Sequence, residues 1–370
     1  MRIGIDARMF GSAFGIGRYI EHISLGIMEL GKARHTFVLF VREAALAQQL
    51  LPKGVDAEIV VAPERWYSWS EQLTWPLRIA RQKLDLIFIP QFNVPLLVPT
   101  PFVVTIHDVT QLYIPGTLQE RSFIHRVATR ATFAHAVTHA RAVIAVSEYT
   151  KGEILKNFSA RKDRVHVIYE GTGLPLGDTI RKNMPAHFVL AVSVWRKHKN
   201  FVGLLHAFAK LRRQKPEYKN VQLVLVGEED PRYPEVRAAI SQLKLSSWVV
   251  TPGAVNDAEL DALYRGADLV VVPSFYEGFA LTALEALARG IPVVASNAAA
   301  LPEVLGDAAM YFNPHDTDEM AEVMIKMLTD DASRKAVLKA APLILGRCSW
   351  NKAAKETLLL LEGATDAKNQ

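Results

Sequence analysis

Short apolar segments alternate with helical patterns along the chain, and this alternation most constrains its fold. In the first half the apolar segments are RIGID, TFVLFV, AEIVV, DLIFIP, FVVTIHD and AVIAVS, at residues 2–6, 36–41, 57–61, 85–90, 102–108 and 142–147. Continuous β-branched runs of this length are typical of parallel strands buried on both faces. The segment between the first two carries one apolar helical stripe: Ile16, Ile20, Ile23, Ile27 and Leu30. The pattern predicts an α/β protein with a parallel sheet.

A second alternation follows a segment rich in Gly and Pro. Its expected strands are HFVLAVS, VQLVLVGEE, SWVVTPG, DLVVVPS and IPVVAS, at residues 187–193, 221–229, 247–253, 268–274 and 291–296. We expect two Rossmann-like domains, 1–170 and 187–346, joined by a linker at 171–186, and a terminal helix at 347–370 that packs back on the first domain. Ligands of such sheets bind at the carboxyl ends of the strands, which predicts a ligand-binding cleft between the domains.

Composition narrows the classes of protein. The single cysteine, Cys348, cannot form an internal disulfide, which favours a reducing compartment. No apolar run approaches the roughly 20 residues of a spanning helix, so we expect a cytoplasmic protein, with peripheral contact at the inner face of the cell membrane as an option. The net charge of +5 mildly favours an anionic partner. Nucleic acid is not expected, because the sequence has no zinc finger, RNA-recognition signature or basic tail.

The most informative stretch is PSFYEGFALTALEA, residues 273–286, which follows an expected strand and opens a helix. Glu277 and Glu285 lie eight positions apart across this turn, and Gly278 lets the backbone approach a ligand closely. The amides expected to open the helix and to bind phosphate are those of Ala280, Leu281 and Thr282. On spacing alone an alternative stays open, in which Thr282 and Glu285 form a capping box and Glu277 is a solvated loop residue.

Cations follow the first strand of the second half, in the stretch VWRKHKN. Arg196 and Lys199 at the carboxyl end of a strand can stabilise the charge that develops on a departing nucleoside diphosphate, without a metal. A solvated basic turn is the alternative. The one D-x-D, Asp316 to Asp318, lies at an expected helix start where capping explains it, so no essential metal is expected.

Two further features lie in the first half. His107 and Asp108 end the expected strand at 102–108, where a histidine can be structural or catalytic. The loop before the first helix contains Gly15 and Gly17, which allow backbone close to a phosphate. Because Ile20 stands where the dinucleotide fingerprint has its third glycine, an NAD-dependent dehydrogenase is disfavoured.

Residues 273–286 resemble the E-x7-E signature of the retaining glycosyltransferases of family 4, and the flanking residues to 315 resemble that family's continuation. The resemblance covers nearly the whole chain and implies the GT-B fold, two Rossmann-like domains facing across a cleft. It implies that Glu277 faces the donor sugar and that Gly278 and Phe279 contact the sugar hydroxyls through their backbone. It also implies that Glu285 takes the ribose and that the diphosphate is bound by the amides of Ala280, Leu281 and Thr282.

The resemblance extends to the other candidate residues. Lys199 matches the lysine of the family's Lys-Asn motif, whereas Val194 stands at the place of the family arginine, so that Arg196 would supply this charge from a shifted position. The family also carries a histidine at the place of His107. The family's first-domain loop, here with Gly15 and Gly17, suggests contact with donor phosphate or acceptor. The nucleobase segment corresponds to Pro252, Gly253, Ala254, Val255 and Asn256, although Asn256 and Glu259 also fit a helix cap.

Within the family, residues 71–99 are similar to bacterial O-antigen and capsule mannosyltransferases. We therefore expect a retaining glycosyltransferase of polysaccharide biosynthesis that moves a hexose from a nucleotide sugar to a glycan or lipid-linked glycan. Mannose from GDP-mannose is the first choice, by resemblance. The alternatives are a nucleotide-sugar epimerase on a GT-B fold and a non-catalytic sugar-nucleotide-binding module.

Two surface features of the first half stay open. An aromatic cluster could stack on acceptor sugars or pack in the core: Trp66, Tyr67, Trp69 and Trp75. A helical stretch at 121–141 interleaves arginines with apolar side chains: Arg121, Phe123, Ile124, Arg126, Val127, Arg130, Phe133 and Arg141. This stretch could face a membrane or present a solvated surface.

Overall fold

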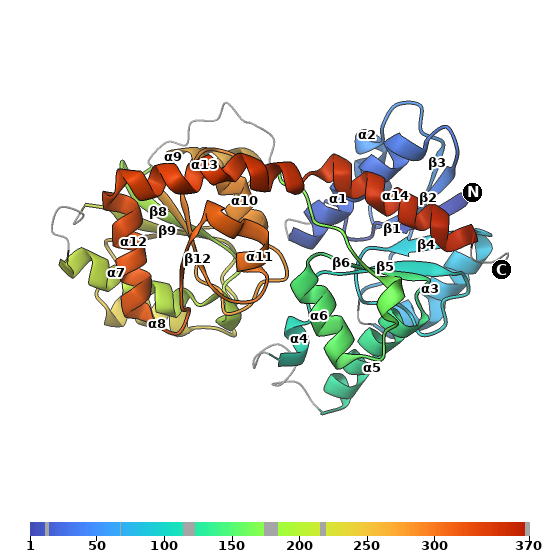
Figure 1. Cartoon of the computed structure of the whole chain (residues 1–370). Helices are drawn as coiled ribbons and strands as arrows, with labels where there is room; N and C mark the ends of the chain where they lie inside the picture. The colour runs from blue at the N-terminus through green and yellow to red at the C-terminus, as the bar shows by residue number, and fades with distance from the viewer. Residues whose placement is uncertain (12–14, 67, 114–122, 174–183, 215–219, 367–370) are drawn as a thin grey trace. The chain divides into compact units, whose positions relative to one another are not determined.

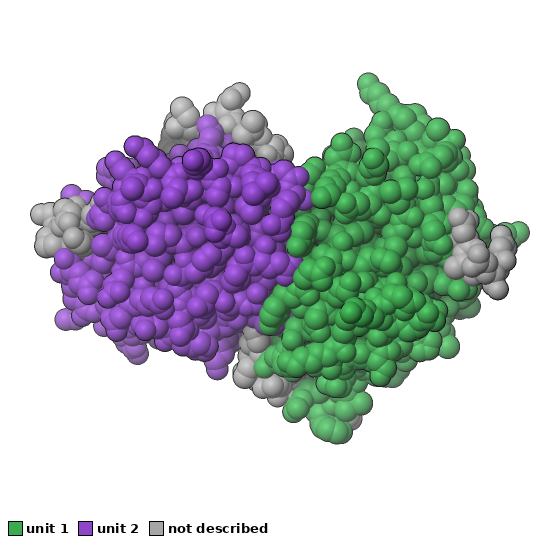
Figure 2. Space-filling view, in the orientation of Figure 1, with its two compact units in different colours: residues 1–171, 348–370 green, residues 172–347 purple. Residues whose placement is uncertain are grey.

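The computed structural model describes residues 1–11, 15–66, 68–113, 123–173, 184–214 and 220–366. The chain divides into two compact units, which Figure 2 shows in different colours. Unit 1 comprises Met1–Gly171 and Cys348–Gln370, and unit 2 comprises Thr172–Arg347. Each unit contains one parallel sheet, so the α/β prediction is confirmed.

Unit 1 contains a seven-stranded sheet of order β3-β2-β1-β4-β5-β6-β7. Its strands are β1 (Arg2–Asp6), β2 (Thr36–Val41), β3 (Ala57–Val61), β4 (Leu86–Ile89), β5 (Phe102–Ile106), β6 (Ala142–Ala145) and β7 (Val165–Val167). In register, Ile3 of β1 pairs with Phe37 and Leu86 on its two sides. The strands β4, β5 and β6 are buried at every position, which explains why the sequence shows them as unbroken apolar runs.

Helices cover both faces of this sheet (Figure 1). They are α1 (Gly15–Gly31), α2 (Ala44–Leu50), α3 (Trp69–Arg81), α4 (Thr110–Tyr113), α5 (Phe123–His139), α6 (Glu148–Asn157), the 3-10 turn η1 (Lys162–Arg164) and α14 (Trp350–Asp366). Because crossovers between parallel strands are right-handed, this strand order puts α1 on one face and α3, α5 and α6 on the other. The terminal helix α14 packs along α1, so closely that a Cβ on Gly26 would lie 2.6 Å from Ala354 Cβ.

Unit 2 contains a six-stranded sheet of order β10-β9-β8-β11-β12-β13. Its strands are β8 (Phe188–Val192), β9 (Gln222–Val226), β10 (Val249–Gly253), β11 (Leu269–Val272), β12 (Val293–Ser296) and β13 (Met310–Phe312). Its helices are η2 (Lys197–Lys199), α7 (Phe201–Gln214), α8 (Glu235–Gln242), α9 (Asp257–Gly266), α10 (Leu281–Leu287), α11 (Leu301–Leu305), η4 (Gly306–Ala308), α12 (Thr317–Thr329) and α13 (Asp331–Arg347). The strands β8 and β11 are neighbours at the centre of this sheet.

Local details decide several sequence interpretations. Asn256 caps α9 in a full capping box with Glu259, as predicted. Asp316 caps α12 by accepting hydrogen bonds from two backbone amides, which confirms its capping role. The capping box proposed as an alternative for Thr282 and Glu285 is wrong, because the N-cap of α10 is Ala280.

Within the described ranges, no helix is both long and apolar enough to cross a bilayer, and no group of acidic, histidine or cysteine side chains could hold a metal ion.

Candidate functional site

In unit 2 the candidate residues follow β8 and β11, the two central strands, at their carboxyl ends. Lys199 Nζ donates hydrogen bonds to both carboxylate oxygens of Glu277, each at 2.9 Å. Ser274 Oγ donates to Glu277 Oε1 at 2.6 Å. The Lys199 and Glu277 side chains are each 19% exposed, so the pair is largely sheltered from water but still accessible. The fold thus joins the two residues that the sequence predicted for the donor phosphate and the donor sugar.

The backbone around this pair is fixed by hydrogen bonds between the turn at 196–200 and the loop after β11. Asn200 adopts a left-handed conformation (φ 55°, ψ 34°), which asparagine tolerates better than most residues. Its Nδ2 donates to the carbonyls of Pro273 and Pro314, at 3.0 and 2.8 Å. The amide of Phe275 donates to the His198 carbonyl at 2.8 Å. The backbone of Lys199 is therefore held in place by the hydrogen bonds of its turn.

The positive charge of this turn is carried by lysine and arginine, not by histidine. Burial, with the nearby charges of Lys199 and Arg196, lowers the pKa of His198 to about 2, so its imidazole is neutral. Arg196 is exposed and forms no ion pair within the described part of the chain. An anion that reached this turn would meet an accessible guanidinium beside a half-buried ammonium.

The loop after Glu277 leads directly into α10. Gly278, Phe279 and Ala280 are buried, whereas Leu281 and Thr282 are half-buried. Ala280, the N-cap, provides no side-chain hydrogen bond to the first turn. The structure therefore shows this backbone beside Glu277, and its contact with a diphosphate stays a prediction.

Glu285 and Val255 are the residues predicted to contact the ribose and the nucleobase of the donor. Glu285 is 1% exposed, and it accepts a hydrogen bond from Tyr264 Oη at 2.8 Å. Val255 is half-buried between β10 and α9. Their roles at the ribose and the nucleobase stay predictions.

In unit 1 the candidate histidine lies just after β5. His107 Nδ1 is 2.9 Å from Glu170 Oε1, and its Nε2 is 3.0 Å from the Pro90 carbonyl oxygen. A carbonyl and an ionised carboxylate can only accept, so these two contacts favour a ring that donates from both nitrogens, the imidazolium. The edge of the Tyr19 ring packs on it, with centroids 4.6 Å apart. These contacts hold the cation in one orientation.

The electrostatics agree with this protonation state. Burial by itself disfavours the charged ring, but the hydrogen bond and charge of Glu170, with smaller contributions from Pro90 and Asp108, raise the pKa of His107 above its usual 6.5. Because this pKa is raised in the folded state, the stabilisation is complete below the ordinary pKa and is lost as pH rises through the raised value. The charged ring therefore persists towards neutral pH.

Glu170 was not singled out in the sequence, where it is the last residue before the expected Gly- and Pro-rich linker. It follows β7, a strand of three residues that is too short to show a period, and it is 3% exposed. Asp108 caps the turn that follows β5, because its Oδ1 accepts a hydrogen bond from the Thr110 amide at 2.9 Å. Gly15 begins α1 and is exposed, whereas Gly17 is buried in its first turn, and residues 12–14 of this loop lie outside the described residues.

Replacing Glu170 with glutamine is expected to lower the pKa of His107, because burial then acts without the charge that opposes it. The midpoint is measured from the His107 ring proton shift against pH, with the resonance assigned through His107→Gln. Glu362→Gln is the matched control, because it removes the carboxylate 2.7 Å from His35 in the same unit. An unchanged His107 midpoint in Glu170→Gln would show that Glu170 does not hold the proton.

These features define a two-unit α/β enzyme with polar groups at the carboxyl ends of its strands, and comparison with known proteins identifies its family. Residues 15–174 match the model for Glycosyltransferase Family 4, and residues 178–343 match the model for Glycosyl transferases group 1. The chain belongs to the family 4 glycosyltransferases, as the E-x7-E resemblance predicted.

The similar curated proteins include several mannosyltransferases. MMP alpha-(1->4)-mannosyltransferase of Mycolicibacterium hassiacum is 32% identical over 60% of this chain and 54% of its own length. O-antigen chain mannosyltransferase B of Escherichia coli is 28% identical, over 69% of this chain and 68% of its own. O-antigen chain mannosyltransferase RfbU of Salmonella typhimurium is 29% identical, over 74% and 73%. The chain thus matches about half of the first relative and a larger share of the other two.

Solved structures share the fold over nearly the full chain. Sucrose-phosphate synthase from Thermosynechococcus elongatus has a TM-score of 0.76 at 20% identity, covering 99% of this chain and 100% of that one. HepE from Anabaena, in complex with UDP and glucose, has a TM-score of 0.74 at 20% identity, covering 98% and 100%. At such identities the likeness concerns the fold, and it confirms the GT-B prediction.

Proposed function

We propose that this glycosyltransferase moves mannose from GDP-mannose to a glycan or lipid-linked glycan, with retention of the anomeric configuration. The observation that carries the proposal is the Lys199–Glu277 pair, a sheltered but accessible cation and carboxylate at the carboxyl ends of β8 and β11. The mannosyltransferases among the similar proteins support the sugar. Retention rests on the family resemblance.

In this proposal unit 2 binds the donor. Lys199 and Arg196 bind the diphosphate with the amides of Ala280, Leu281 and Thr282, while Glu277 accepts hydrogen bonds from the sugar hydroxyls. Glu285 binds the ribose, and the segment with Val255 contacts the base. Since Lys199 already pairs with Glu277, its ammonium group would bind a phosphate oxygen and the Glu277 carboxylate at the same time.

Chemistry then needs one bond exchange. The bond between the anomeric carbon and the phosphate oxygen breaks as an acceptor hydroxyl oxygen bonds to that carbon on the same face. The hydroxyl proton goes to the leaving phosphate, whose developing charge Lys199 and Arg196 stabilise without a metal. In unit 1, His107, as an imidazolium oriented by Glu170, provides a fixed positive charge for binding donor phosphate or acceptor. The backbone amides near Gly15 and Gly17 provide hydrogen-bond donors for the same ligands.

The test compares nucleotide sugars as ligands of the whole chain in buffer with EDTA. GDP-mannose is expected to raise the melting temperature, because a ligand at 100 times its Kd stabilises the native state by about 2.7 kcal/mol. UDP- and dTDP-sugars at the same concentration are expected to give smaller shifts. A larger shift with a UDP-sugar would overturn the choice of donor.

A product assay separates the alternatives. Transfer to an added mannoside acceptor supports the proposal, whereas isomerisation of the donor without an acceptor would indicate an epimerase. Binding with neither reaction on a panel of glycan and lipid-linked acceptors would indicate a non-catalytic module.

A further inference from the structure

The outward surface of α3 is apolar. Trp69, Leu73 and Leu77 lie at positions i, i+4 and i+8 of this helix and are 84%, 64% and 62% exposed. The opposite side of α3 is already buried, with Trp75 and Ile79 at 0% exposure. A helix on the surface of a domain ordinarily has polar residues on its outer face, so this stripe is not explained by the core of unit 1.

The segment between β4 and β5 extends this apolar surface. Leu96 and Leu97 are 51% and 76% exposed. On one side the segment is tied to α3, because the Leu96 amide donates to Gln72 Oε1 at 3.0 Å. On the other side it meets α5, because the Phe92 ring stacks on Phe133 with centroids 3.8 Å apart. We name the combined surface the α3 face: Trp69, Leu73, Leu77, Leu96 and Leu97.

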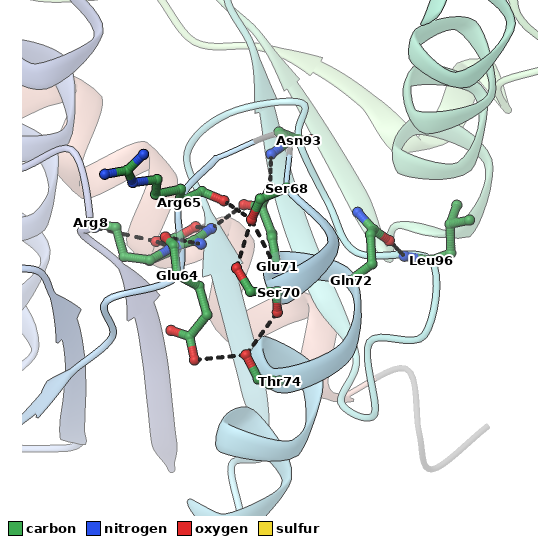
Figure 3. Close-up of polar contacts among 11 residues, drawn as sticks. Arg8, Glu64, Arg65, Ser68, Ser70, Glu71, Gln72, Thr74, Asn93 and Leu96 are labelled. Carbon is green, nitrogen blue, oxygen red and sulfur yellow. Dashed lines mark hydrogen bonds and ion pairs between the residues drawn. The ribbon is translucent and has the colours of Figure 1, made fainter. Parts of the chain in front are cut away.

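Buried contacts hold the α3 face in place from beneath (Figure 3). Glu71 of α3 accepts hydrogen bonds from Arg8, which follows β1, and from Asn93, which follows β4. All three side chains are buried. The helix and the segment with Leu96 are therefore fixed relative to each other before any partner arrives, which lowers the ordering cost of binding.

The exposed charged side chains of the segments that carry or contact the α3 face have one sign. In residues 62–83, 91–101 and 123–141 the acidic residues are Glu64 and Glu71, which are 4% and 0% exposed. The exposed lysine and arginine side chains of the same segments are Arg65, Arg81, Lys83, Arg126 and Arg130. The exposed charged side chains of these segments are therefore all positive, and together with the apolar face they complement an anionic surface.

The same charges argue against a second copy of the chain. A two-fold symmetric contact pairs a patch with itself, so it would bring the arginines at the edges of two α3 faces together. Like charges at such a contact oppose association. Anionic lipid headgroups, in contrast, pair with these arginines while the acyl region receives the leucines.

We propose that the α3 face docks unit 1 on an anionic lipid bilayer, with its leucines and Trp69 entering the boundary of the headgroups and acyl chains. The predicted membrane-facing stretch at 121–141 contributes through its first turns, where Phe123, Arg126, Val127 and Arg130 are exposed, whereas Phe133 is buried. Arg121 and the side chain of Ile124 lie outside the described residues. The inference rests on the proposed function for its purpose, since a lipid-linked acceptor would lie at such a surface.

The test measures co-sedimentation of the whole chain with vesicles of phosphatidylcholine that contain either no anionic lipid or about 30% phosphatidylglycerol. The chain is expected to bind the anionic vesicles, and to bind them less at high salt. The double variant Leu73→Gln, Leu97→Gln is expected to lower the partition coefficient about tenfold or more, because two exposed leucines lose their burial in lipid. Leu343→Gln is the matched control, a 74% exposed leucine on α13 of unit 2.

Each other outcome overturns the inference. The α3 face is not a docking surface if wild type ignores anionic vesicles, or if the double variant binds as wild type does. Sedimentation equilibrium without lipid tests whether a second copy of the chain binds the α3 face instead. A wild-type dimer that the double variant abolishes would show that it does. Arg126→Gln with Arg130→Gln gives an independent check, because it should reduce the preference for anionic vesicles while leaving the leucines in place.

The failure of this inference differs from failure of the proposed function. The melting-temperature shift with GDP-mannose depends on unit 2 residues that the leucine variants do not touch. If the wild-type chain shows the shift with GDP-mannose but does not bind anionic vesicles, or if the double variant binds them as wild type does, the docking surface alone is overturned. Vesicle binding without a shift from any nucleotide sugar would overturn the proposed donor site alone.

Discussion

Replacing Lys199 with methionine is expected to lower kcat for sugar transfer by about 10²- to 10³-fold, the usual cost of one fixed group that stabilises developing charge. Methionine keeps the length and apolar contacts of the stem but removes the ammonium that lies 2.9 Å from both oxygens of Glu277. Steady-state kinetics at saturating donor and acceptor measure the effect. Because the charge on the diphosphate grows as the glycosidic bond breaks, the loss should fall on kcat more than on KM.

Lys197→Met is the matched control for this prediction. Lys197 lies in the same turn and carries the same charge, but its side chain is exposed and forms no ion pair within the described residues. It should therefore keep kcat within a few-fold of wild type. Equal losses in the two variants would mean that the general positive potential of the turn matters and that the contact with Glu277 does not. A kcat in Lys199→Met within a few-fold of wild type would overturn the proposed donor site.

The sheets were largely predictable from the sequence because their central strands are buried on both faces. The strands β4 (LIFI) and β6 (AVIA) contain no polar residue that would interrupt the apolar pattern. The strands β7 and β13 were missed because three residues are too few for a period to appear. The sequence thus indicated every strand of both sheets except one three-residue edge strand in each.

The pairing of Lys199 with Glu277 was half predictable. Each residue follows an expected strand, and neighbouring parallel strands end at the same edge of a sheet. Which strands are neighbours depends on the order β8-β11, in which two other strands intervene along the chain, and no local pattern contains this information. Ser274, which donates to Glu277 at 2.6 Å, was visible only as part of a motif.

The partners of buried charges were the least predictable feature. Glu170 was overlooked because β7 is short and the Gly- and Pro-rich stretch follows directly after Glu170, so the sequence does not show that Glu170 lies at the end of a strand. Among the aromatic residues, Trp75 is buried beneath Arg8 and Trp69 is 84% exposed, although both belong to one helix. Trp66 is half-buried beside Arg42, and Tyr67 lies outside the described residues. Periodicity shows that a helix is amphipathic, but it does not show which residues of other elements its buried side chains contact.

The largest expected effect on stability comes from Arg8, whose side chain is 0% exposed. Its guanidinium donates to both oxygens of Asp6 at 2.8 Å and to Glu71 Oε1 at 2.8 Å, and it lies 4.2 Å from the centre of the Trp75 ring. The buried charge of the two carboxylates, together with their hydrogen bonds, raises the pKa of Arg8 despite the opposing effect of its burial. Figure 3 shows this guanidinium directed towards Glu71.

Arg8→Met is therefore expected to destabilise unit 1 by about 3–5 kcal/mol, because it leaves two buried carboxylates without their cation. The chain has two units, so the unfolding of unit 1 is followed by hydrogen exchange of the β1 and β4 amides across a urea series rather than by one global signal. Arg34→Met is the control: Arg34 pairs with Glu362 but is 56% exposed, and its loss should cost at most about 1 kcal/mol.

A second substitution distinguishes the loss of charge balance from the loss of packing. If uncompensated carboxylates cause the instability, then Arg8→Met combined with Glu71→Gln should be more stable than Arg8→Met alone, because one of the two buried charges has been removed. If the missing contact with Trp75 causes it, the second substitution should bring no recovery. In the first case the segment after β1 is held to α3 by the charge pair of Arg8 with Glu71. Asn93, which follows β4, donates a hydrogen bond to the same carboxylate, so the α3 face should lose part of its fixed geometry in Arg8→Met.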